Sequence, residues 1–216
     1  TGVIKDPTGT APTEKVRFFR IEPVCSTTKY GDGKSSDCTY NSARSERTQR
    51  SSQQPSERWY GWSFYLPEDF PVGKEQKAGG AYTFGQWHNG HCPHAAIMNA
   101  PSETTMLYVE TSVPQGGYDC GRDKQLPIAD MRTLLGKWNK IEVYAKWGKT
   151  DGVFCLYLNG ELVIDHQGRT LTSGYEDINY FKYGVYQCCT KGVELITPYE
   201  VYYTNVKSAK TREVLQ

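Results

Sequence analysis

The chain has 216 residues, with 25 basic and 24 acidic side chains and a formal net charge of +1. A nearly neutral chain offers no general electrostatic attraction to nucleic acid or to an anionic membrane, so neither is expected as a partner. No apolar run approaches the length of a membrane span, and residues 1–216 are expected to form one domain with a substantial core.

Strand patterning dominates the chain. Apolar and polar residues alternate with period two, which is typical of half-buried strands, and Gly, Pro, Ser and Asp clusters separate the runs. Only residues 126–136 have a helical pattern. Many antiparallel strands without alternating helices predict an all-β sandwich or jelly roll. The strands are predicted at residues 16–23, 42–50, 58–67, 82–88, 105–113, 137–147, 153–158, 161–166, 179–187 and 199–209.

The dipeptide Asn159-Gly160 lies between two apolar runs in residues 153–166. Asn and Gly both tolerate the positive φ angles of a type I′ turn. The segment is therefore predicted to be a β-hairpin.

Residues 85–95, GQWHNGHCPHA, hold three of the four histidines and one cysteine. Such a tract raises the question of a zinc site. Zinc ligands usually converge from two separate elements, and no second Cys-x-x-Cys or His-x-x-x-His pair is present. A glycine and a proline also give residues 89–94 the composition of a loop. No metal is expected here, and the loop residues are predicted to include His91, Cys92 and His94.

Seven cysteines, with 16 tyrosines and 21 glycines, are typical of a secreted, extracellular β-protein stabilised by disulfides. Cys25 and Cys38 flank a polar, glycine-containing segment, which predicts one bridge. A second bridge is predicted between Cys92 and Cys120, and it would remove Cys92 from any metal site. The chain also opens on Thr1 rather than Met, as a processed mature protein does. The remaining cysteines leave one odd thiol and no assignable connectivity: Cys155, Cys188 and Cys189.

Strand alternation predicts which polar side chains share a face. Taken alone, each polar stripe is most simply a solvated outer face. The three predicted stripes are Arg44, Glu46, Thr48 and Arg50; then Gln86 and His88 with Tyr82 and Phe84; then Tyr180, Lys182, Gly184 and Tyr186.

Together the stripes contain the groups that β-elimination of a uronic-acid polymer requires. The C5 proton of a uronate becomes acidic when hydrogen-bond donors or cations stabilise the charge that develops on the adjacent carboxylate. Arg, Gln and His side chains supply such donors. A tyrosine can then accept the C5 proton and return one to the leaving O4, and a nearby cation favours its phenolate form.

Three motifs carry a resemblance to known families. RSER (44–47), QWH (86–88) and YFKYGVY (180–186) resemble, in the same order, the motifs of family 7 alginate lyases. The surrounding sequence, over roughly residues 40–190, is similar to the heparin-lyase-I-like and glucuronan lyase (family 20) group. The resemblance implies a concanavalin-like β-jelly roll whose concave face binds an acidic polysaccharide.

The resemblance also implies residue roles. Tyr186 would transfer the proton, and His88 would act as a second acid/base or as a partner of the substrate carboxylate. Gln86 and Arg44 would neutralise that carboxylate. Trp87, the middle residue of its motif, is expected to point into the core. The other residues expected to bind substrate are Lys182, Tyr180, Glu46, Arg50 and Tyr82.

The expected function is endo-acting cleavage of a β-1,4-linked polyuronate, either glucuronan or mannuronate-type alginate. Those two uronates share their configuration at C4 and C5, so the catalytic set does not distinguish them. A concanavalin-like glycoside hydrolase is disfavoured because its closely spaced carboxylate pair is absent from the sequence. A non-catalytic polysaccharide-binding module remains an alternative. A monomer without a required cofactor is expected, and the sequence leaves a structural calcium ion open.

Overall fold

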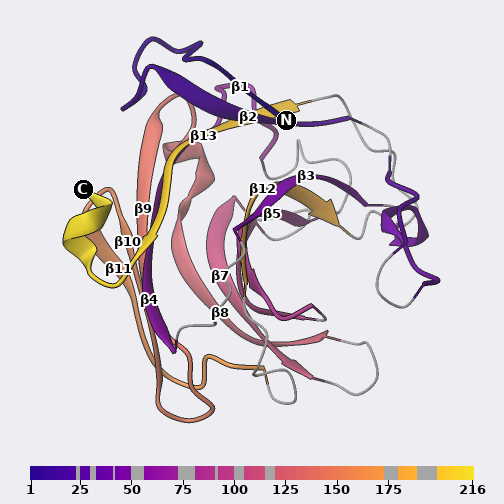
Figure 1. Cartoon of the computed structure of the whole chain (residues 1–216), viewed down its shortest axis with the longest axis vertical. Helices are drawn as coiled ribbons and strands as arrows, with labels where there is room; N and C mark the ends of the chain where they lie inside the picture. The colour runs from indigo at the N-terminus through magenta and orange to yellow at the C-terminus, as the bar shows by residue number, and fades with distance from the viewer. Residues whose placement is uncertain are drawn as a thin grey trace.

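Two antiparallel sheets make up the computed structural model of this chain (Figure 1). It describes residues 1–22, 25–29, 33–40, 42–49, 56–72, 81–90, 92–99, 105–114, 120–172, 180–188 and 199–216. In this part of the chain, helical structure is limited to short 3-10 turns: η1 (Asp37–Tyr40), η3 (Met131–Thr133) and η4 (Arg212–Leu215).

The outer sheet has seven strands in the described residues. Their order across the sheet is β1 (Gly2–Lys5), β2 (Lys15–Ile21), β13 (Tyr199–Ala209), β4 (Glu57–Tyr65), β9 (Trp138–Lys146), β10 (Gly152–Leu158) and β11 (Glu161–Gly168).

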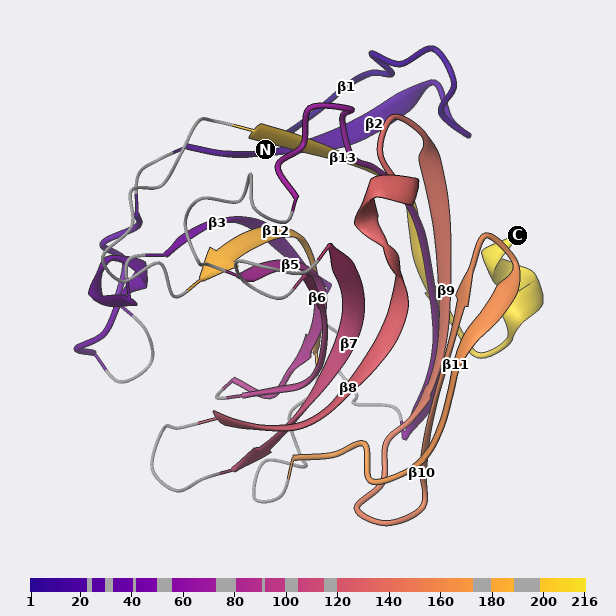
Figure 2. The same cartoon turned by 180° about the vertical axis from the view of Figure 1, so that it is seen from behind.

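The inner sheet has six strands within the described ranges. It lies inside the curve of the outer sheet, with its concave face turned away from that sheet (Figure 2). This architecture is the β-jelly roll expected from the sequence. The order across the inner sheet is β3 (Ala43–Gln49), β12 (Tyr180–Cys188), β5 (Ala81–His88), β6 (Pro93–Asn99), β7 (Met106–Pro114) and β8 (Cys120–Asp130).

One hydrophobic core joins the facing sides of the two sheets. Trp87 on β5 is fully buried, as expected from its place in the alternation. Its ring centroid lies 5.0 Å from that of Phe181 on β12 and 5.2 Å from that of Phe154 on β10, so aromatic contacts link the sheets. Burial of such large rings is the main favourable term for bringing the two layers together.

The predicted hairpin at Asn159-Gly160 is confirmed. Both residues have positive φ angles, 52° and 92°, and the turn joins β10 to β11. The side-chain oxygen of Asn159 also accepts a hydrogen bond from the backbone N–H of Lys140 at 2.8 Å, which ties the turn to β9.

The helical prediction for residues 126–136 is wrong. β8 continues to Asp130, and only the 3-10 turn Met131–Thr133 follows it. Pairing with β7 places Leu126 opposite Val109 and Ala129 opposite Leu107. These long-range ladder bonds and the buried apolar contacts outweigh a weak local helical preference.

Strand β6 (Pro93–Asn99) was missed by the sequence analysis, which placed His94 in a loop. The strand is buried on both faces, so its residues do not alternate between apolar and polar. His94 is 1% exposed, and its Nδ1 accepts a hydrogen bond from the backbone N–H of Thr172 at 3.0 Å. His94 is therefore a buried structural histidine on a strand, and its prediction as a loop residue is wrong.

A β-bulge in β5 overturns the prediction that Tyr82 and Phe84 share a face with Gln86. The pairing of β5 with β6 shifts between Thr83 and Gly85; Phe84 lies in the core, and a Cβ at Gly85 would also face the core rings of Phe181 and Trp62. Tyr82 is 2% exposed and packs against Phe70 and Tyr199 in the core. Burial also raises the pKa of the Tyr82 hydroxyl to about 12, so this residue stays a neutral phenol. It does not lie on the substrate-facing side predicted for it.

Gly184 in β12 is expected to tolerate no side chain. Its φ is 129°, and a Cβ there would lie 2.3 Å from the backbone oxygen of Ser45 on β3. Gly184→Ala should therefore lower the free energy of unfolding by about 2–5 kcal/mol through strain and overpacking. Gly9→Ala is the control, because its φ is 70° and nothing lies within 4 Å; it should cost only about 1–2 kcal/mol. Equal losses in urea unfolding would contradict the clash at Gly184.

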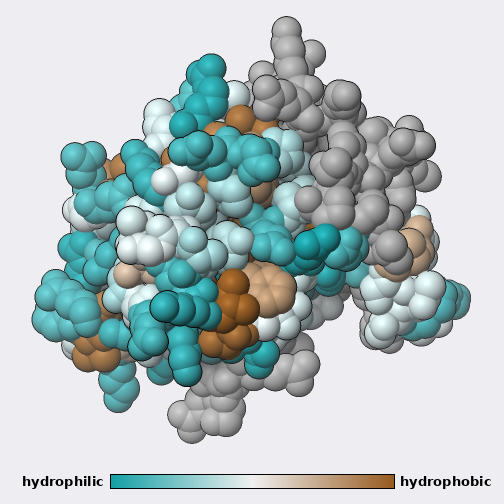
Figure 3. Space-filling view, turned by 90° about the horizontal axis from the view of Figure 1, so that it is seen from above, coloured by the Kyte–Doolittle hydropathy of each residue, from teal (hydrophilic) through white to brown (hydrophobic). Residues whose placement is uncertain are grey.

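Hydrophilic and intermediate residues cover most of the described surface in Figure 3, and the apolar residues form separate patches. Among the described residues, no helix is long and apolar enough to cross a membrane. Scattered exposed apolar side chains of this kind are normal for a folded domain. The large ones are Val3, Leu162 and Val214.

Candidate active site

Cross-strand register brings the predicted site residues together on the concave face of the inner sheet. β12 is the central strand of the cluster. Tyr186 lies opposite Arg44 on β3, and Lys182 lies opposite Gln86 on β5. Residues directly opposite each other on neighbouring strands point to the same side of the sheet. Residues far apart in the sequence thus form one polar cluster, which also contains Glu46, His88 and Tyr180.

Glu46 is the electrostatic centre of this cluster. Its side chain is only 5% exposed, and its oxygens accept hydrogen bonds from Gln86 Nε2 at 2.6 Å and Lys182 Nζ at 3.2 Å. A guanidinium nitrogen of Arg44 lies 3.4 Å away. A buried carboxylate is stable only when it is paired and hydrogen-bonded in this way. The sequence analysis assigned Glu46 to substrate binding, whereas its described contacts are with the neighbouring side chains.

Arg44 is held by a residue that the sequence analysis did not identify. Its Nε donates to both carboxylate oxygens of Asp37, at 2.9 and 2.8 Å, and Asp37 is 3% exposed. The guanidinium carbon lies 4.2 Å from the ring centroid of Tyr186, a cation–π contact. Burial alone would lower the pKa of Arg44, but the hydrogen bonds with Asp37 and the charges of Tyr186 and Glu46 outweigh it. The pKa is raised, and Arg44 stays a cation.

Tyr186 lies between a cation and a hydroxyl group. The half-buried ring lies under the Arg44 guanidinium, with 4.2 Å between the guanidinium carbon and the ring centroid, and the Tyr186 hydroxyl is 3.5 Å from Ser42 Oγ. Lys182 is bonded to Glu46 instead, so Arg44 is the cation whose contact with the Tyr186 ring is described.

His88 has a defined tautomer when its ring is neutral. Nδ1 accepts a hydrogen bond from the backbone N–H of Gly90 at 2.9 Å, so the ring proton is on Nε2. The rings of His88 and Tyr180 stack, with centroids 5.6 Å apart, and the Tyr180 hydroxyl is 3.3 Å from Nδ1. Tyr180 thus supports the imidazole, and Nε2 is oriented as a hydrogen-bond donor.

A row of paired residues extends from this cluster across the whole inner sheet. Gln86 on β5 lies opposite Ala96 on β6, which lies opposite Glu110 on β7. Glu110 lies opposite Gln125 on β8 and accepts a hydrogen bond from its amide at 3.2 Å. At a spacing of ~4.8 Å between strands, the six strands span a distance longer than one sugar residue. The concave face can therefore contact several residues of an extended chain.

The cysteines and histidines of the described residues do not form a metal cluster: no group of three or more His, Cys, Asp or Glu side chains could hold an ion. The predicted bridge between Cys25 and Cys38 is confirmed. Cys92 is also disulfide-bonded, which removes it as a thiolate ligand. The side chain of Cys120 lies outside the described part, so the pairing of Cys92 with Cys120 stays a prediction. Cys155 is a free thiol.

Of the nine predicted site residues, seven lie in the cluster: Arg44, Glu46, Gln86, His88, Tyr180, Lys182 and Tyr186. Tyr82 lies in the core instead, and Arg50 is outside the described residues. The sequence analysis missed Asp37 and Ser42. Only the position of Asp37 beside the predicted bridge residue Cys38 connects it to a constrained segment, and nothing local indicates Arg44 as its partner.

A sequence profile described as polysaccharide lyase matches residues 17–207. The chain belongs to the polysaccharide lyase family. No curated protein sequence matches it significantly. Membership of this family agrees with the resemblance carried by the three motifs, and it makes the protein a polysaccharide lyase.

Several solved structures are similar in fold. An endo-β-1,4-glucuronan lyase from the fungus Trichoderma reesei has 19% identity and a TM-score of 0.69, covering 97% of this chain and 87% of that chain. The family 7 alginate lyase A1-II′, in complex with substrate (GGMG), has 14% identity and a TM-score of 0.61, with 97% and 81% covered. A glycoside hydrolase family 131 catalytic domain from Coprinopsis cinerea has 13% identity and a TM-score of 0.56, with 97% and 78% covered. At these identities the similarity establishes the fold and does not identify the substrate.

Proposed function

We propose that the protein cleaves a β-1,4-linked polyuronate, glucuronan or mannuronate-type alginate, by β-elimination. The observation that carries this proposal is the convergence of Tyr186, Gln86 and His88 with two cations on one concave face. These residues supply a proton-transfer group and carboxylate hydrogen-bond donors, which are the two requirements of the reaction.

In the proposed mechanism, the amide of Gln86 and the Nε2–H of His88 bind the uronate carboxylate and stabilise the charge that develops on it. Lys182 adds positive charge to the same side. The Tyr186 phenolate removes H5, the C4–O4 bond breaks as the C4–C5 double bond forms, and the Tyr186 phenol then protonates the leaving O4. Tyr186 ends the cycle as a phenolate, so protons and charge balance.

Arg44 has a different role in this proposal from the one expected from the sequence. Asp37 and Glu46 hold its guanidinium, and Asp37 binds it with both carboxylate oxygens. Its described contact with the reacting groups is the ring of Tyr186, 4.2 Å from the guanidinium carbon. Arg44 therefore positions Tyr186 and stabilises its phenolate, and binding of the substrate carboxylate is assigned to Gln86, His88 and Lys182.

The same features support the proposed substrate class, the mode of cleavage and secretion of the protein. One tyrosine can serve both proton transfers only when H5 and O4 lie on the same side, as in glucuronate and mannuronate. The row of residues across six strands supports binding within a long chain, and hence endo action. The disulfides at Cys25–Cys38 and at Cys92 support a secreted protein. The chemistry contains no step that needs a cofactor.

An assay on purified polyuronates tests the proposal. The protein is incubated with glucuronan, polymannuronate and polyguluronate, and the ultraviolet absorbance of 4,5-unsaturated uronate is read together with reducing ends. Both signals should rise on glucuronan or polymannuronate, and a chelator should leave the rates unchanged. Reducing ends without unsaturation would indicate a hydrolase. Binding without either signal would indicate a non-catalytic module.

A further inference from the structure

The 3-10 turn η1 (Asp37–Tyr40) is linked to Tyr186 through two intermediate residues, Arg44 and Ser42. Through its side chain, Asp37 binds the Nε of Arg44 with both carboxylate oxygens, and Arg44 lies over the Tyr186 ring. Through its backbone oxygen, Asp37 accepts a hydrogen bond from the N–H of Ser42 at 2.9 Å, and Ser42 Oγ is 3.5 Å from the Tyr186 hydroxyl. Asp37 thus holds both Arg44, which lies over the Tyr186 ring, and Ser42, which lies next to the Tyr186 hydroxyl.

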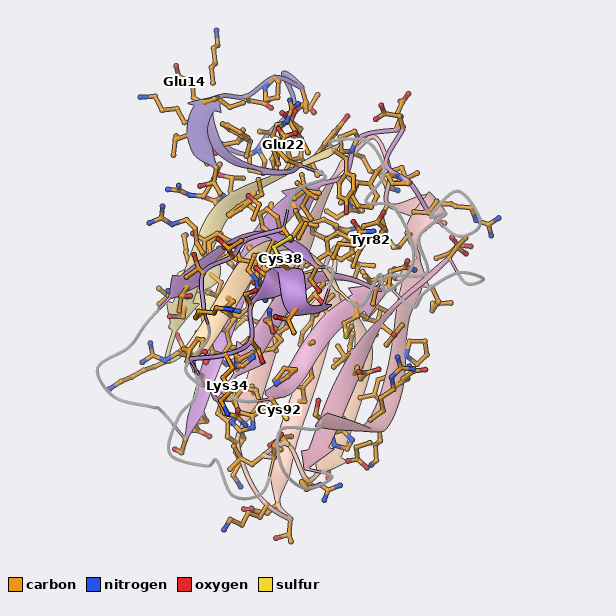
Figure 4. The ribbon with its side chains drawn as sticks, turned by 90° about the vertical axis from the view of Figure 1, so that its right-hand side faces the viewer. Glu14, Glu22, Lys34, Cys38, Tyr82 and Cys92 are labelled. Atoms are coloured by element: carbon orange, nitrogen blue, oxygen red, sulfur yellow. A yellow bond between two sulfur atoms is a disulfide. The ribbon has the colours of Figure 1, made fainter. Side chains whose placement is uncertain are left out.

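A covalent bridge holds Asp37 in place. The next residue, Cys38, is bonded to Cys25, and its backbone N–H donates to the oxygen of Ser26 at 3.2 Å. Cys38 is itself the second residue of η1, and Figure 4 shows it at the coil of this turn. A single 3-10 turn has little stability of its own, since its hydrogen bonds are few and poorly aligned. The bridge therefore supplies much of the constraint that the turn lacks.

We propose that Asp37 is a positioning residue for Tyr186 and that the Cys25–Cys38 bridge makes the activity sensitive to thiol reductants. This inference rests on the proposed lyase function. Asp37 acts through Arg44 and Ser42 and does not touch the substrate. A dithiol reduces the bridge by two exchange steps: the bridge gains two electrons and two protons and becomes two thiols, and the dithiol becomes a cyclic disulfide. Release of η1 then loosens both contacts with Tyr186.

The pH dependence separates positioning from a general loss of structure. In the described residues, the charged or titratable side chains of the cluster around Tyr186 are Asp37 on η1, Arg44 and Glu46 on β3, His88 on β5, and Tyr180 and Lys182 on β12. Without the Asp37 contacts, the Arg44 guanidinium can move away from the Tyr186 ring, and the phenolate loses the stabilisation of that cation. The acidic limb of the pH–rate profile, which reports deprotonation of the base, should therefore move to higher pH.

Asp37→Asn tests the first part of this inference. The variant loses the charge that holds the Arg44 guanidinium, so kcat should fall on the order of 10²-fold with KM nearly unchanged. The acidic limb should also move to higher pH; a move to lower pH would mean that Arg44 keeps its place without Asp37 and would contradict the positioning role. Asp123→Asn is the matched control. Asp123 accepts a hydrogen bond of 2.8 Å from Arg169, and neither residue belongs to the cluster. Both kcat and the pH–rate profile of this variant should match wild type. A fall in kcat without a shift in the profile, or no fall at all, would overturn the role of Asp37.

Cys25→Ser/Cys38→Ser tests the second part. Its kcat should fall in the same way, while circular dichroism and the melting transition show that the fold is retained. Dithiothreitol should lower wild-type turnover to the level of this variant and change the variant little. If the reductant lowers both equally, a different bridge is responsible and the sensitivity assigned to Cys25–Cys38 is wrong. A wild-type protein inactive on every polyuronate would overturn the proposed function itself, whereas active variants beside an active wild type would overturn this inference alone.

Discussion

Tyr186→Phe is expected to lower turnover on the cleaved polyuronate by at least about 10²–10⁴-fold, the usual contribution of general acid–base catalysis. The substitution removes one oxygen and keeps the ring, so the contact with the Arg44 guanidinium, 4.2 Å from the ring centroid, should survive. Substrate affinity should therefore change little. Steady-state kinetics give kcat and KM, and titration calorimetry with a uronate oligosaccharide gives the affinity of the variant.

Tyr180→Phe is the control for this prediction. Tyr180 lies on the same strand and face, but its contact is with His88, whose ring it stacks against at 5.6 Å. Its hydroxyl is not placed beside the Arg44 cation, so a milder loss is expected. If Tyr180→Phe abolishes activity while Tyr186→Phe stays near wild type, the proton-transfer residue is wrongly assigned.

Trp87→Ala should give the largest loss of stability among single core substitutions, about 3–5 kcal/mol in the free energy of unfolding. The indole is fully buried and contacts rings from both sheets, including Trp62, Phe154 and Phe181. No smaller neighbour can fill the resulting cavity without moving strands. Urea unfolding followed by tryptophan fluorescence and by circular dichroism measures the change.

The same substitution should also lower activity in the fraction that remains folded. Trp87 lies between Gln86 and His88 on β5, so movement of the strand displaces both carboxylate-binding side chains. Leu162→Ala is the control: Leu162 is 49% exposed on β11, and its loss should cost no more than about 0.5 kcal/mol. A stability loss at Trp87 as small as that at Leu162 would contradict a core centred on this ring.

The sequence by itself determined the elements with a clear local signal. Alternation predicted most strands and the faces of β3 and β12, because a residue's side in a strand depends only on its position in the chain. It thereby predicted that Arg44 and Glu46 share a face, and that Lys182 and Tyr186 do. The Asn159-Gly160 turn was predictable for the same reason, since its positive φ angles are a property of two adjacent residues.

The tertiary structure alone decided which strands are neighbours. The placement of β12 between β3 and β5 creates the site, and it depends on hydrogen bonds between segments more than 90 residues apart. The bulge at Phe84 and Gly85, which moves Tyr82 into the core, depends on pairing with β6. Strand β6 itself carries no alternation because both its faces are buried. Asp37 became recognisable only when the Cys25–Cys38 bridge and the fold brought it against Arg44, because no local pattern encodes a contact made across space.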